Sequence, residues 1–320
     1  MQACMETLEK IGIVPVIKID DAEKAVPLAK ALLAGDIPCA EITFRTAEAA
    51  TAIRRIAAEV PEVLVGAGTV LTVGQVDEAE KAGAKFVVSP GFNRKVVEHC
   101  LGRGMPVIPG CASPSDMEVA LELGLETVKF FPAEQSGGLE YLKAVAAPYP
   151  GLRFVPTGGI NAGNVGRYIA FERVLACGGS WMVPPEVVAS GDFRRITELA
   201  REAIFAMLGF APAHVGIGTR NPDEVAKATG FFASLFGFPL REGPASVYVT
   251  ESIEVLKVPA PGSKGHIGIG TNSLVRAAAF LERSGIAFDW PDAKRDAKGR
   301  VAALYMKEEL LGFGVHLMQR

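Results

Sequence analysis

The sequence lacks the features of a secreted or membrane protein. Its 320 residues include five cysteines, an odd number, and no CxxC pair. Free thiols in a reducing compartment fit this pattern better than a disulfide framework does. No apolar run approaches the roughly 18 to 20 residues that cross a bilayer. The N-terminal MQACMETLEK carries acids where a signal peptide has a basic start. We therefore expect a cytoplasmic protein with no membrane partner.

Neither sign of charge dominates. The chain has 33 basic and 36 acidic residues and a net charge of -3, so it lacks the basic excess of a nucleic-acid binder. The basic stretch at 292–300 is more typical of a solvated loop. Hydrophobic residues make up 49%, which excludes a disordered chain, and the length predicts one large or two moderate domains.

Short apolar segments alternate with helical-period segments over the first two hundred residues. The strand-like segments begin at Ile13, Cys39, Leu64, Phe86, Met105, Thr127, Arg153 and Val174. Runs this short and rich in Val, Ile and Phe predict parallel strands joined by helices. Eight of them predict an α/β fold of the (β/α)8 TIM-barrel type. An open doubly wound sheet is the alternative, but it would have a Gly-rich turn after its first strand, where KIDDAEKA has no glycine.

Two of these strands carry charged side chains that we expect inside the barrel. In CAEITFR, Glu41 and Arg45 share a face, and the opposite face is wholly apolar and belongs against the helices. On the sixth strand, Lys129 lies among apolar neighbours. Desolvation there favours the neutral amine, the nucleophile needed to attack a ketone. A structural ion pair, or a lysine that reaches the rim with its stem packed on apolar surface, is the alternative.

Together these residues suggest imine chemistry on a 2-oxo acid. Lys129 would form the imine, Glu41 would move protons, and Arg45 with Thr69 would hold the carboxylate. Barrels of this type often bind phosphate after the seventh and eighth strands. The candidates at those positions are Thr157, Gly158, Gly159, Gly179 and Ser180. An imine-forming lysine, a carboxylate clamp and a phosphate site describe a class I aldolase.

Residues 11–207 closely resemble the KDPG/KHG aldolase family, the 2-dehydro-3-deoxy-6-phosphogluconate and 4-hydroxy-2-oxoglutarate aldolases. The motifs that carry the resemblance are VPVI, EITFRT, VGAGTVL, SPGF, IPG, VKFFPAE, FVPTGGI and GGSW. The resemblance implies that Lys129 is the Schiff-base residue, that Glu41 is the general acid/base, and that Phe131 lines the pocket. It also implies that Arg45 and Thr69 meet the pyruvyl carboxylate, and that Thr157, Gly158, Gly159 and Ser180 receive the phosphate end.

The implied reaction is cleavage of 2-dehydro-3-deoxy-6-phosphogluconate to pyruvate and glyceraldehyde 3-phosphate, with 4-hydroxy-2-oxoglutarate as a further substrate. The resemblance also implies a homotrimer and no metal or other cofactor for the aldol step. The preference between phosphorylated and unphosphorylated substrates stays open. The alternatives are an aldolase for another 2-oxo-3-deoxy acid, a barrel that only binds a phosphosugar, and a phosphosugar epimerase or isomerase.

The last hundred residues predict a separate α+β domain. We assign residues 1–208 to the barrel, 209–213 to a linker and 214–320 to the second domain. HVGIG from His214 and GHIGIG from Gly265 each precede a helical segment and strand-like runs, which indicates an internal duplication of a βαβββ module. The expected strand-like runs of the second module include AFDW, VAALYM and GVHLM.

That duplication resembles the vicinal oxygen chelate (glyoxalase/bleomycin-resistance) superfamily. The resemblance implies that His214, Glu254, His266 and His316 ligate a divalent transition metal such as Zn, Ni, Fe or Mn, although a glutamate is more usual at position 316. The alternative is that the histidines only form hydrogen bonds. The domain could be a second enzyme for an oxo acid or aldehyde, a regulatory sensor, or an assembly module.

Overall fold

The computed structural model describes all residues from 1 to 320, and the chain divides into two compact units. Unit 1 is Met1–Met207 and unit 2 is Leu208–Arg320. None of the helices combines the length and the apolar character needed to span a bilayer.

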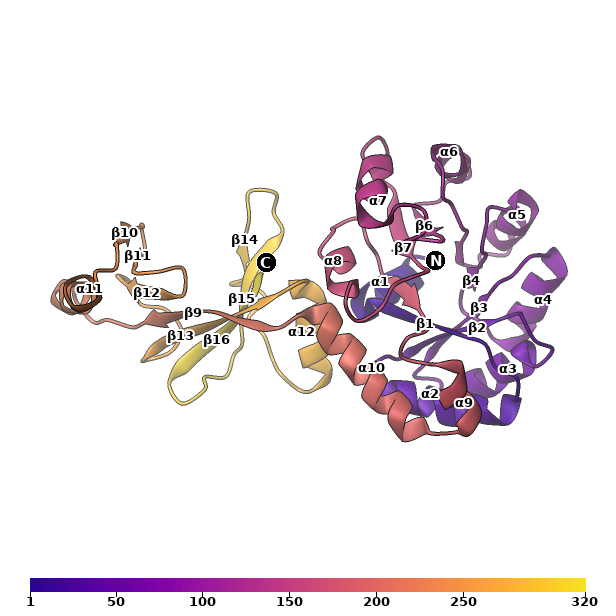
Figure 1. Cartoon of the computed structure of the whole chain (residues 1–320), viewed down its shortest axis with the longest axis horizontal. Coiled ribbons are helices and arrows are strands. Elements are labelled where there is room, and N and C mark those ends of the chain that lie inside the picture. The colour runs from indigo at the N-terminus through magenta and orange to yellow at the C-terminus, as the bar shows by residue number, and fades with distance from the viewer. The chain divides into compact units, whose positions relative to one another are not determined.

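Unit 1 is a closed barrel of eight parallel strands (Figure 1). The strands are β1 (Ile13–Ile17), β2 (Cys39–Thr43), β3 (Leu64–Gly68), β4 (Val87–Val88), β5 (Val107–Ile108), β6 (Thr127–Phe130), β7 (Arg153–Pro156) and β8 (Cys177–Gly179). Six pair in the order β5-β4-β3-β2-β1-β8, and β6 pairs with β7. A parallel bridge from Gly110 to Lys129 joins β5 to β6, and another from Phe154 to Val174 joins β7 to the segment before β8. The ring is therefore closed, which confirms the expected (β/α)8 fold.

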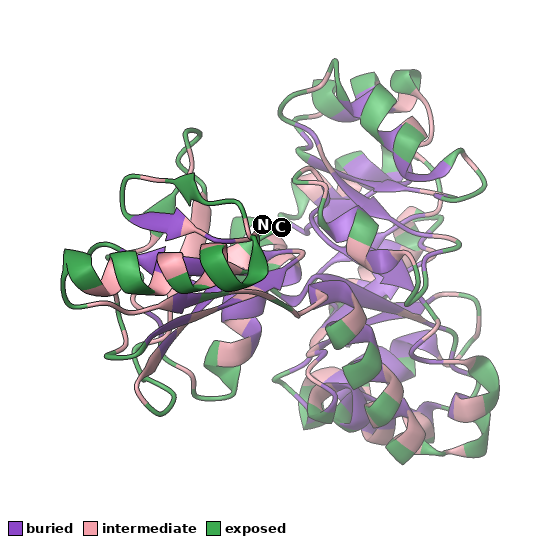
Figure 2. Ribbon diagram, turned by 60° about the vertical axis from the view of Figure 1, so that its left-hand side comes forward, coloured by how far each residue is buried: buried purple, intermediate pink, exposed green.

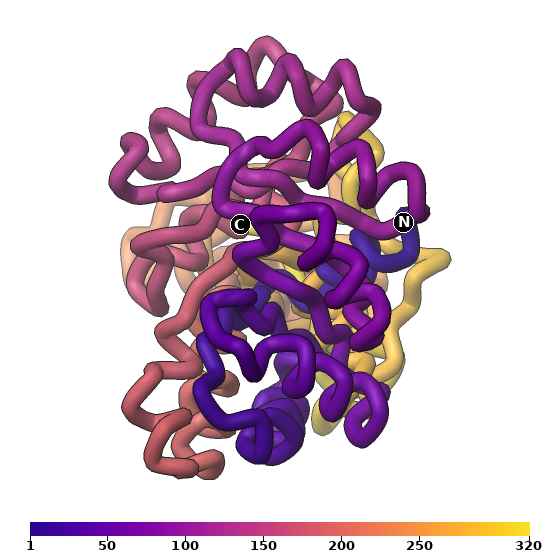
Figure 3. The backbone as a smooth tube through the Cα atoms, turned by 90° about the vertical axis from the view of Figure 1, so that its right-hand side faces the viewer, coloured from indigo at the N-terminus to yellow at the C-terminus, as the bar shows by residue number.

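Helices follow the strands around the outside of the barrel. They are α1 (Gln2–Ile11), which precedes β1, then α2 (Ala25–Ala34), α3 (Ala49–Glu59), α4 (Val73–Ala82), α5 (Arg94–Gly102), α6 (Pro114–Glu122), α7 (Gly138–Ala146), α8 (Val165–Ile169), α9 (Pro185–Ser190) and α10 (Phe193–Leu208), with a 3-10 turn at Ala22–Lys24. The colour of the chain in Figure 3 advances around unit 1, because successive strand–helix units lie side by side. The core lies between strands and helices, and Figure 2 shows the strands buried and the outer helix faces exposed.

Local sequence explains where several of these helices begin. Thr72 and Gln75 form a capping box at the start of α4, and Ser113 forms one with Asp116 at the start of α6. Each cap satisfies backbone N–H groups that have no partner within the helix and contributes about 1 kcal/mol. These short helices are thereby fixed close to the loops that follow the barrel strands.

Unit 2 is one eight-stranded mixed sheet built from two βαβββ modules. The first module has β9 (Ala211–Ile217), α11 (Pro222–Phe236), β10 (Arg241–Glu242), β11 (Ser246–Tyr248) and β12 (Ile253–Leu256). The second has β13 (Gly265–Thr271), α12 (Leu274–Arg283), β14 (Lys294–Arg295), β15 (Val301–Tyr305) and β16 (Phe313–Gln319). The order is β10-β11-β12-β9-β13-β16-β15-β14. The repeated segments β9 and β13 pair antiparallel at the centre, as a duplicated module requires.

Two details of unit 2 differ from the sequence-based expectation. Residues 211–213 belong to β9 and not to a linker. Proline has no N–H to donate to a neighbouring strand, but Pro212 lies beside a shift in the register between β9 and β13, where that hydrogen bond is not needed. AFDW contributes only a single bridge between Phe288 and Met306. Pro291 follows Trp290 and ends that run. The strand that pairs with β15 is instead β14, at Lys294–Arg295.

Candidate functional site

A lysine and a glutamate meet inside the barrel of unit 1. Lys129 on β6 and Glu41 on β2 are 6% and 3% exposed, and their Nζ and Oε1 atoms lie 3.7 Å apart. Strands β2 and β6 are not neighbours in the ring, so the two side chains meet only because both point inward. The structure therefore places Lys129 and Glu41 on the inward faces that strand alternation predicts.

The carboxylate of Glu41 lacks a hydrogen-bond partner at one of its oxygens. Its Oε1 atom is buried and accepts no hydrogen bond within the chain. Gly68 at the end of β3 provides the space, because a Cβ at this position would overlap Oε1 and the carboxyl carbon of Glu41. A buried polar atom without a partner is costly, and such atoms in native proteins commonly mark catalytic sites. Sequence reasoning missed this role of Gly68, although the residue lies within the VGAGTVL motif.

Arg45 and Thr69 lie at the rim of the barrel. The Nε atom of Arg45 lies 3.4 Å from Oγ1 of Thr69, just beyond the ends of β2 and β3. Arg45 is exposed, so it lies at the rim and is not buried inside the barrel with Glu41 as alternation predicts. Strand β2 ends at Thr43, and the alternation of its faces does not continue through the turn that follows. Thr69 adopts a left-handed φ of 54°, which directs its hydroxyl toward the guanidinium from an uncommon backbone conformation.

Phe131 follows β6 directly and lies beside the amine. The centre of its ring is 5.3 Å from Nζ of Lys129, and the side chain is half-buried. An aromatic ring at this distance limits the access of water to the amine and contacts a charged ammonium favourably. Phe131 is thus placed to line a pocket above Lys129.

The loops after β7 and β8 present backbone N–H groups at the rim of the barrel. Gly158 and Gly159 have φ angles of 98° and 79°, which other residues adopt only with strain. The Nδ2 atoms of Asn161 and Asn164 each donate to the carbonyl of Gly159 at 3.1 Å and fix the loop. The N–H groups of Gly159 and exposed Ser180 make no hydrogen bond within the chain. Free N–H groups on a glycine-rich turn are suited to a phosphate.

Two further residues predicted for the phosphate site lie beside these loops. Thr157 is buried, and a bridge joins it to Gly178 on β8. Gly179 ends β8, where a Cβ would overlap the ring of Trp181. Glycine at this position therefore leaves room for the Trp181 ring beside the end of β8.

Comparison with known proteins places unit 1 in a family. The sequence pattern of the KDPG and KHG aldolases matches residues 4–199. The chain belongs to the KDPG/KHG aldolase family. A 2-dehydro-3-deoxy-phosphogluconate aldolase of Treponema pallidum is 54% identical over 204 residues, which are 64% of this chain and 97% of that protein. The KHG/KDPG aldolase of Escherichia coli K12 is 47% identical over 192 residues, which are 60% of this chain and 90% of that protein.

Solved structures of KDPG aldolases share the fold. The enzyme of Legionella pneumophila, crystallised with pyruvate as a covalent carbinolamine intermediate, is 40% identical with a TM-score of 0.60 and covers 62% of this chain and 97% of its own. The enzyme of Zymomonas mobilis ZM4 with 3-phosphoglycerate is also 40% identical, with a TM-score of 0.59, and covers 62% of this chain and 94% of its own. The family match ends at residue 199, so it leaves unit 2 outside the aldolase.

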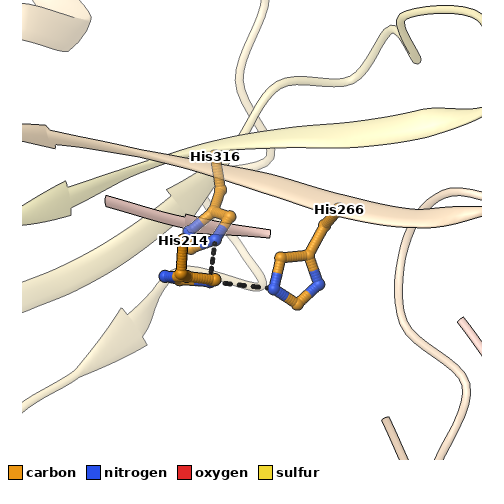
Figure 4. A group of neighbouring side chains, drawn as sticks. All are labelled: His214, His266 and His316. Carbon is orange, nitrogen blue, oxygen red and sulfur yellow. Dashed lines mark hydrogen bonds between the residues drawn. The ribbon is translucent and has the colours of Figure 1, made fainter. Parts of the chain in front are cut away.

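Unit 2 brings together the three histidines that the sequence singled out. His214, His266 and His316 come from β9, β13 and β16, and Figure 4 shows their rings turned toward one another. Nε2 of His214 lies 2.9 Å from Nε2 of His266 and 3.2 Å from Nε2 of His316. Glu254 on β12 completes the group, with its Oε1 atom 2.8 Å from Nε2 of His266 and 3.6 Å from Nε2 of His214.

Burial keeps these imidazoles neutral. Desolvation lowers the pKa of His214 and His266, with Glu254 acting in the opposite direction. Desolvation, together with the charge of the other two histidines, lowers the pKa of His316 to about 3. Neutral imidazole is the form that ligates a metal ion.

The spacing of the four atoms suits a single divalent ion. An ion bound at about 2.1 Å places neighbouring ligand atoms roughly 3.0 to 3.4 Å apart. Four of the six separations run from 2.8 to 3.6 Å, and the three histidine ligand atoms all lie within 4.8 Å of one another. A purely hydrogen-bonded cluster would require Nε2 of His214 to serve both other Nε2 atoms, although an imidazole nitrogen offers only one proton or one lone pair.

Sequence reasoning missed the residues that surround this cluster. Ser246 on β11 donates its hydroxyl to Oε2 of Glu254 at 2.9 Å, which leaves Oε1 directed at the histidines. The ring of Tyr305 stacks on His316, with centres 4.7 Å apart. The buried Nδ1 atoms of His266 and His316 have no partner within the chain, so ring packing has to orient these imidazoles. The signal for Ser246 and Tyr305 was weak, since both lie on short strands whose pairing depends on distant residues.

A cavity of about 550 Å³ opens above the cluster. We call this cavity the cup. It is lined by the four residues of the cluster together with Ala245, Ser246, Tyr248, Glu251, Leu256, Val258, Pro259, Ala260, Pro261, Asp292, Lys294, Tyr305 and Met318. A volume of this size suits a small organic ligand.

Proposed function

We propose that unit 1 is a class I aldolase that reversibly cleaves 2-dehydro-3-deoxy-6-phosphogluconate to pyruvate and glyceraldehyde 3-phosphate, and also acts on 4-hydroxy-2-oxoglutarate. The observation that supports this most directly is the buried pair of Lys129 and Glu41 inside the barrel, 3.7 Å apart. The family relationship supports the same reaction, because the relatives are named for it.

The pair supplies the two functions that the reaction needs. The amine of Lys129 attacks the C2 ketone, and loss of water gives a protonated imine that withdraws electrons from the adjacent carbon. Glu41 removes the proton of the C4 hydroxyl, the C3–C4 bond breaks, and glyceraldehyde 3-phosphate leaves. The remaining enamine takes a proton at C3 from Glu41, and water then releases pyruvate and frees the lysine. The protonated imine is the electron sink, so the proposed step uses no metal or other cofactor.

The two ends of the substrate would be held by different parts of the rim. We propose that Arg45 and Thr69 bind the carboxylate next to the ketone, since their side chains meet at the ends of β2 and β3. We propose that Thr157, Gly158, Gly159, Gly179 and Ser180 form the phosphate site, since this part of the rim offers free N–H groups on fixed glycine turns. Phe131 would shield the imine from water.

A coupled assay for pyruvate release from 2-dehydro-3-deoxy-6-phosphogluconate tests the proposal. Wild-type protein should release pyruvate, and the Lys129→Ala variant should show no turnover above background. Lys143→Ala removes an exposed lysine of α7 and should leave the rate unchanged. Equal rates for wild type and Lys129→Ala would reject the assignment. The homotrimer implied by the family resemblance stays a prediction, and sedimentation equilibrium of the full chain tests it.

We propose that unit 2 binds one divalent transition metal through His214, Glu254, His266 and His316. The convergence of three histidine nitrogens, the contacts of Glu254 with His266 and His214, and the neutral imidazoles support this proposal. Bound there, the metal would supply a Lewis acid at the floor of the cup. The chain should purify from metal-replete medium with close to one equivalent of metal, and His266→Ala should lose it. Less than about a tenth of an equivalent in the wild type would contradict the proposal.

A further inference from the structure

The glycine turn assigned above to the phosphate lies beside a carboxylate. Gly159, whose N–H makes no hydrogen bond within the chain, is in the loop after β7, and Glu134 is in the loop after β6. A Cβ atom on Gly159 would lie only 2.6 Å from Cβ and Cγ of Glu134, so the stem of the glutamate packs directly on the glycine. A free N–H and a carboxylate able to accept it are therefore neighbours, yet they do not pair.

Tyr168 on α8 explains why the carboxylate leaves this N–H free. Its hydroxyl donates a hydrogen bond to Oε1 of Glu134. Glu134 is exposed as a residue, but Tyr168 is only 1% exposed, so the donor is shielded from water. Burial, together with this hydrogen bond, raises the pKa of Tyr168, and the phenol keeps its proton. A carboxylate that accepts such a bond is held in one direction.

Backbone contacts fix the two loops around this pair. The N–H of Glu134 donates to the carbonyl of Gly158 at 3.1 Å, and one residue earlier Ala133 donates to the carbonyl of Thr157 at 2.7 Å. Gly138 at the start of α7 leaves room for the carboxylate, because a Cβ on Gly138 would lie 3.3 Å from Oε1 of Glu134. The direction of the Glu134 side chain therefore depends chiefly on its hydrogen bond with the tyrosine.

Loss of the tyrosine hydroxyl would release this side chain beside the turn. The carboxylate of Glu134 would then be free to accept the N–H of Gly159, since a charged acceptor forms the stronger hydrogen bond. That contact would occupy a donor that a phosphate oxygen needs, and it would place like charges together. The hydroxyl of Tyr168 thus keeps the N–H of Gly159 open.

We propose that Tyr168 and Glu134 form a positioning pair that keeps the N–H of Gly159 available to the substrate phosphate, and so favours phosphorylated substrates. This inference rests on the proposed aldolase function and deepens it, because it assigns residues that govern a preference the sequence leaves open. Both residues act through Gly159 and not on the reacting atoms.

The test compares a measurement that needs the phosphate site with one that does not. Steady-state cleavage of 2-dehydro-3-deoxy-6-phosphogluconate depends on the phosphate site, whereas borohydride trapping of pyruvate reports on the imine site alone. In Tyr168→Phe we expect kcat/KM for cleavage to fall by at least about fivefold, while the trapping rate stays within about twofold of wild type. Tyr149→Phe is the matched control, since it removes another hydrogen bond from a tyrosine to a glutamate, at 3.2 Å to Glu118, and should change neither measurement.

A second substitution separates this role from a merely structural one. Glu134→Met keeps a hydrocarbon stem against Gly159 and removes the carboxylate that would compete for its N–H. In the double variant Tyr168→Phe/Glu134→Met we expect kcat/KM to return to within about twofold of wild type, because both polar partners are gone and neither is left unpaired. If Tyr168 only supported the fold, the double variant would be at least as impaired as Tyr168→Phe.

Three results would overturn the proposal. The first is unchanged kcat/KM in Tyr168→Phe, and the second is a double variant that is no better than Tyr168→Phe. The third is an equal loss of pyruvate trapping in Tyr168→Phe, which would show damage to the whole barrel. A wild type that neither cleaves the substrate nor traps pyruvate would contradict the proposed function and this inference with it. Normal wild-type activity with any of the three results would contradict this inference alone.

Discussion

Nζ of Lys129 and Oε1 of Glu41 lie 3.7 Å apart across the interior of the barrel, on two strands that share no edge. The oxygen that faces the amine is buried and accepts no hydrogen bond. A carboxylate oxygen left free beside an amine is ready to take a proton from a molecule bound to that amine. The pair therefore combines a covalent site with a proton carrier, and each half can be tested separately.

Replacement of Glu41 by Gln should separate imine formation from proton transfer. The amide keeps the size of the side chain but cannot accept and return a proton, so kcat should fall by about a hundredfold or more. The same variant should still form a borohydride-trapped adduct with pyruvate. Steady-state rates and trapping yields check this prediction, and a variant with near wild-type kcat would contradict the role of Glu41.

Gly68→Ala should lower activity by displacing Glu41. The new Cβ would overlap the carboxylate of Glu41, which has to move away from Lys129. We expect a decrease of kcat of roughly tenfold or more, because small displacements of a catalytic group carry large costs. Gly102→Ala is the matched control, since nothing lies within 4 Å of the added Cβ in α5. Equal activity of the two variants would show that the packing of Gly68 against Glu41 does not matter.

Ser246→Ala should weaken metal binding in unit 2 and leave the aldolase rate unchanged. The hydroxyl fixes Oε2 of Glu254, and loss of such an orienting hydrogen bond typically costs about ten- to a hundredfold in metal affinity. Competition with a chelator of known affinity measures the change. Ser252→Ala, on an exposed turn, is the control and should bind metal like the wild type.

Metal-free unit 2 should lose stability as the pH falls below about 6.5. The pKa of His316 is about 3 in the folded chain and about 6.5 in the unfolded chain. Between these two pH values the unfolded state binds a proton that the folded state does not. Stability therefore rises with pH in this window, by up to about 1.4 kcal/mol per pH unit. His214 and His266, whose pKa values are also lowered, add to the effect.

Urea unfolding followed by the fluorescence of Trp290 measures this effect. Trp181→Phe removes the other tryptophan of the chain, so that the signal reports on unit 2. His316→Gln should flatten the dependence on pH between 5 and 7. A midpoint that does not change with pH in the parent would contradict the burial of neutral imidazoles.

Much of the fold could be predicted from local pattern. Short apolar runs and glycine-containing strand ends recur with a regular period in unit 1, so eight strands and a ring could be inferred without contacts. The inward direction of Glu41 and Lys129 followed from alternation within their strands. Arg45 could not be placed in the same way, since β2 ends two residues earlier and a turn has no fixed period. The roles of Gly68 and Ser246 depend on pairing between distant segments, which no local pattern records.

Reduction of the protein with borohydride in the presence of pyruvate tests the central claim most directly. If Lys129 is the amine that condenses with the substrate, mass spectrometry after digestion should find one pyruvate-derived adduct, on the peptide that contains Lys129. The adduct should be absent from Lys129→Ala. An adduct on a different lysine, or no adduct in the wild type, would contradict the account.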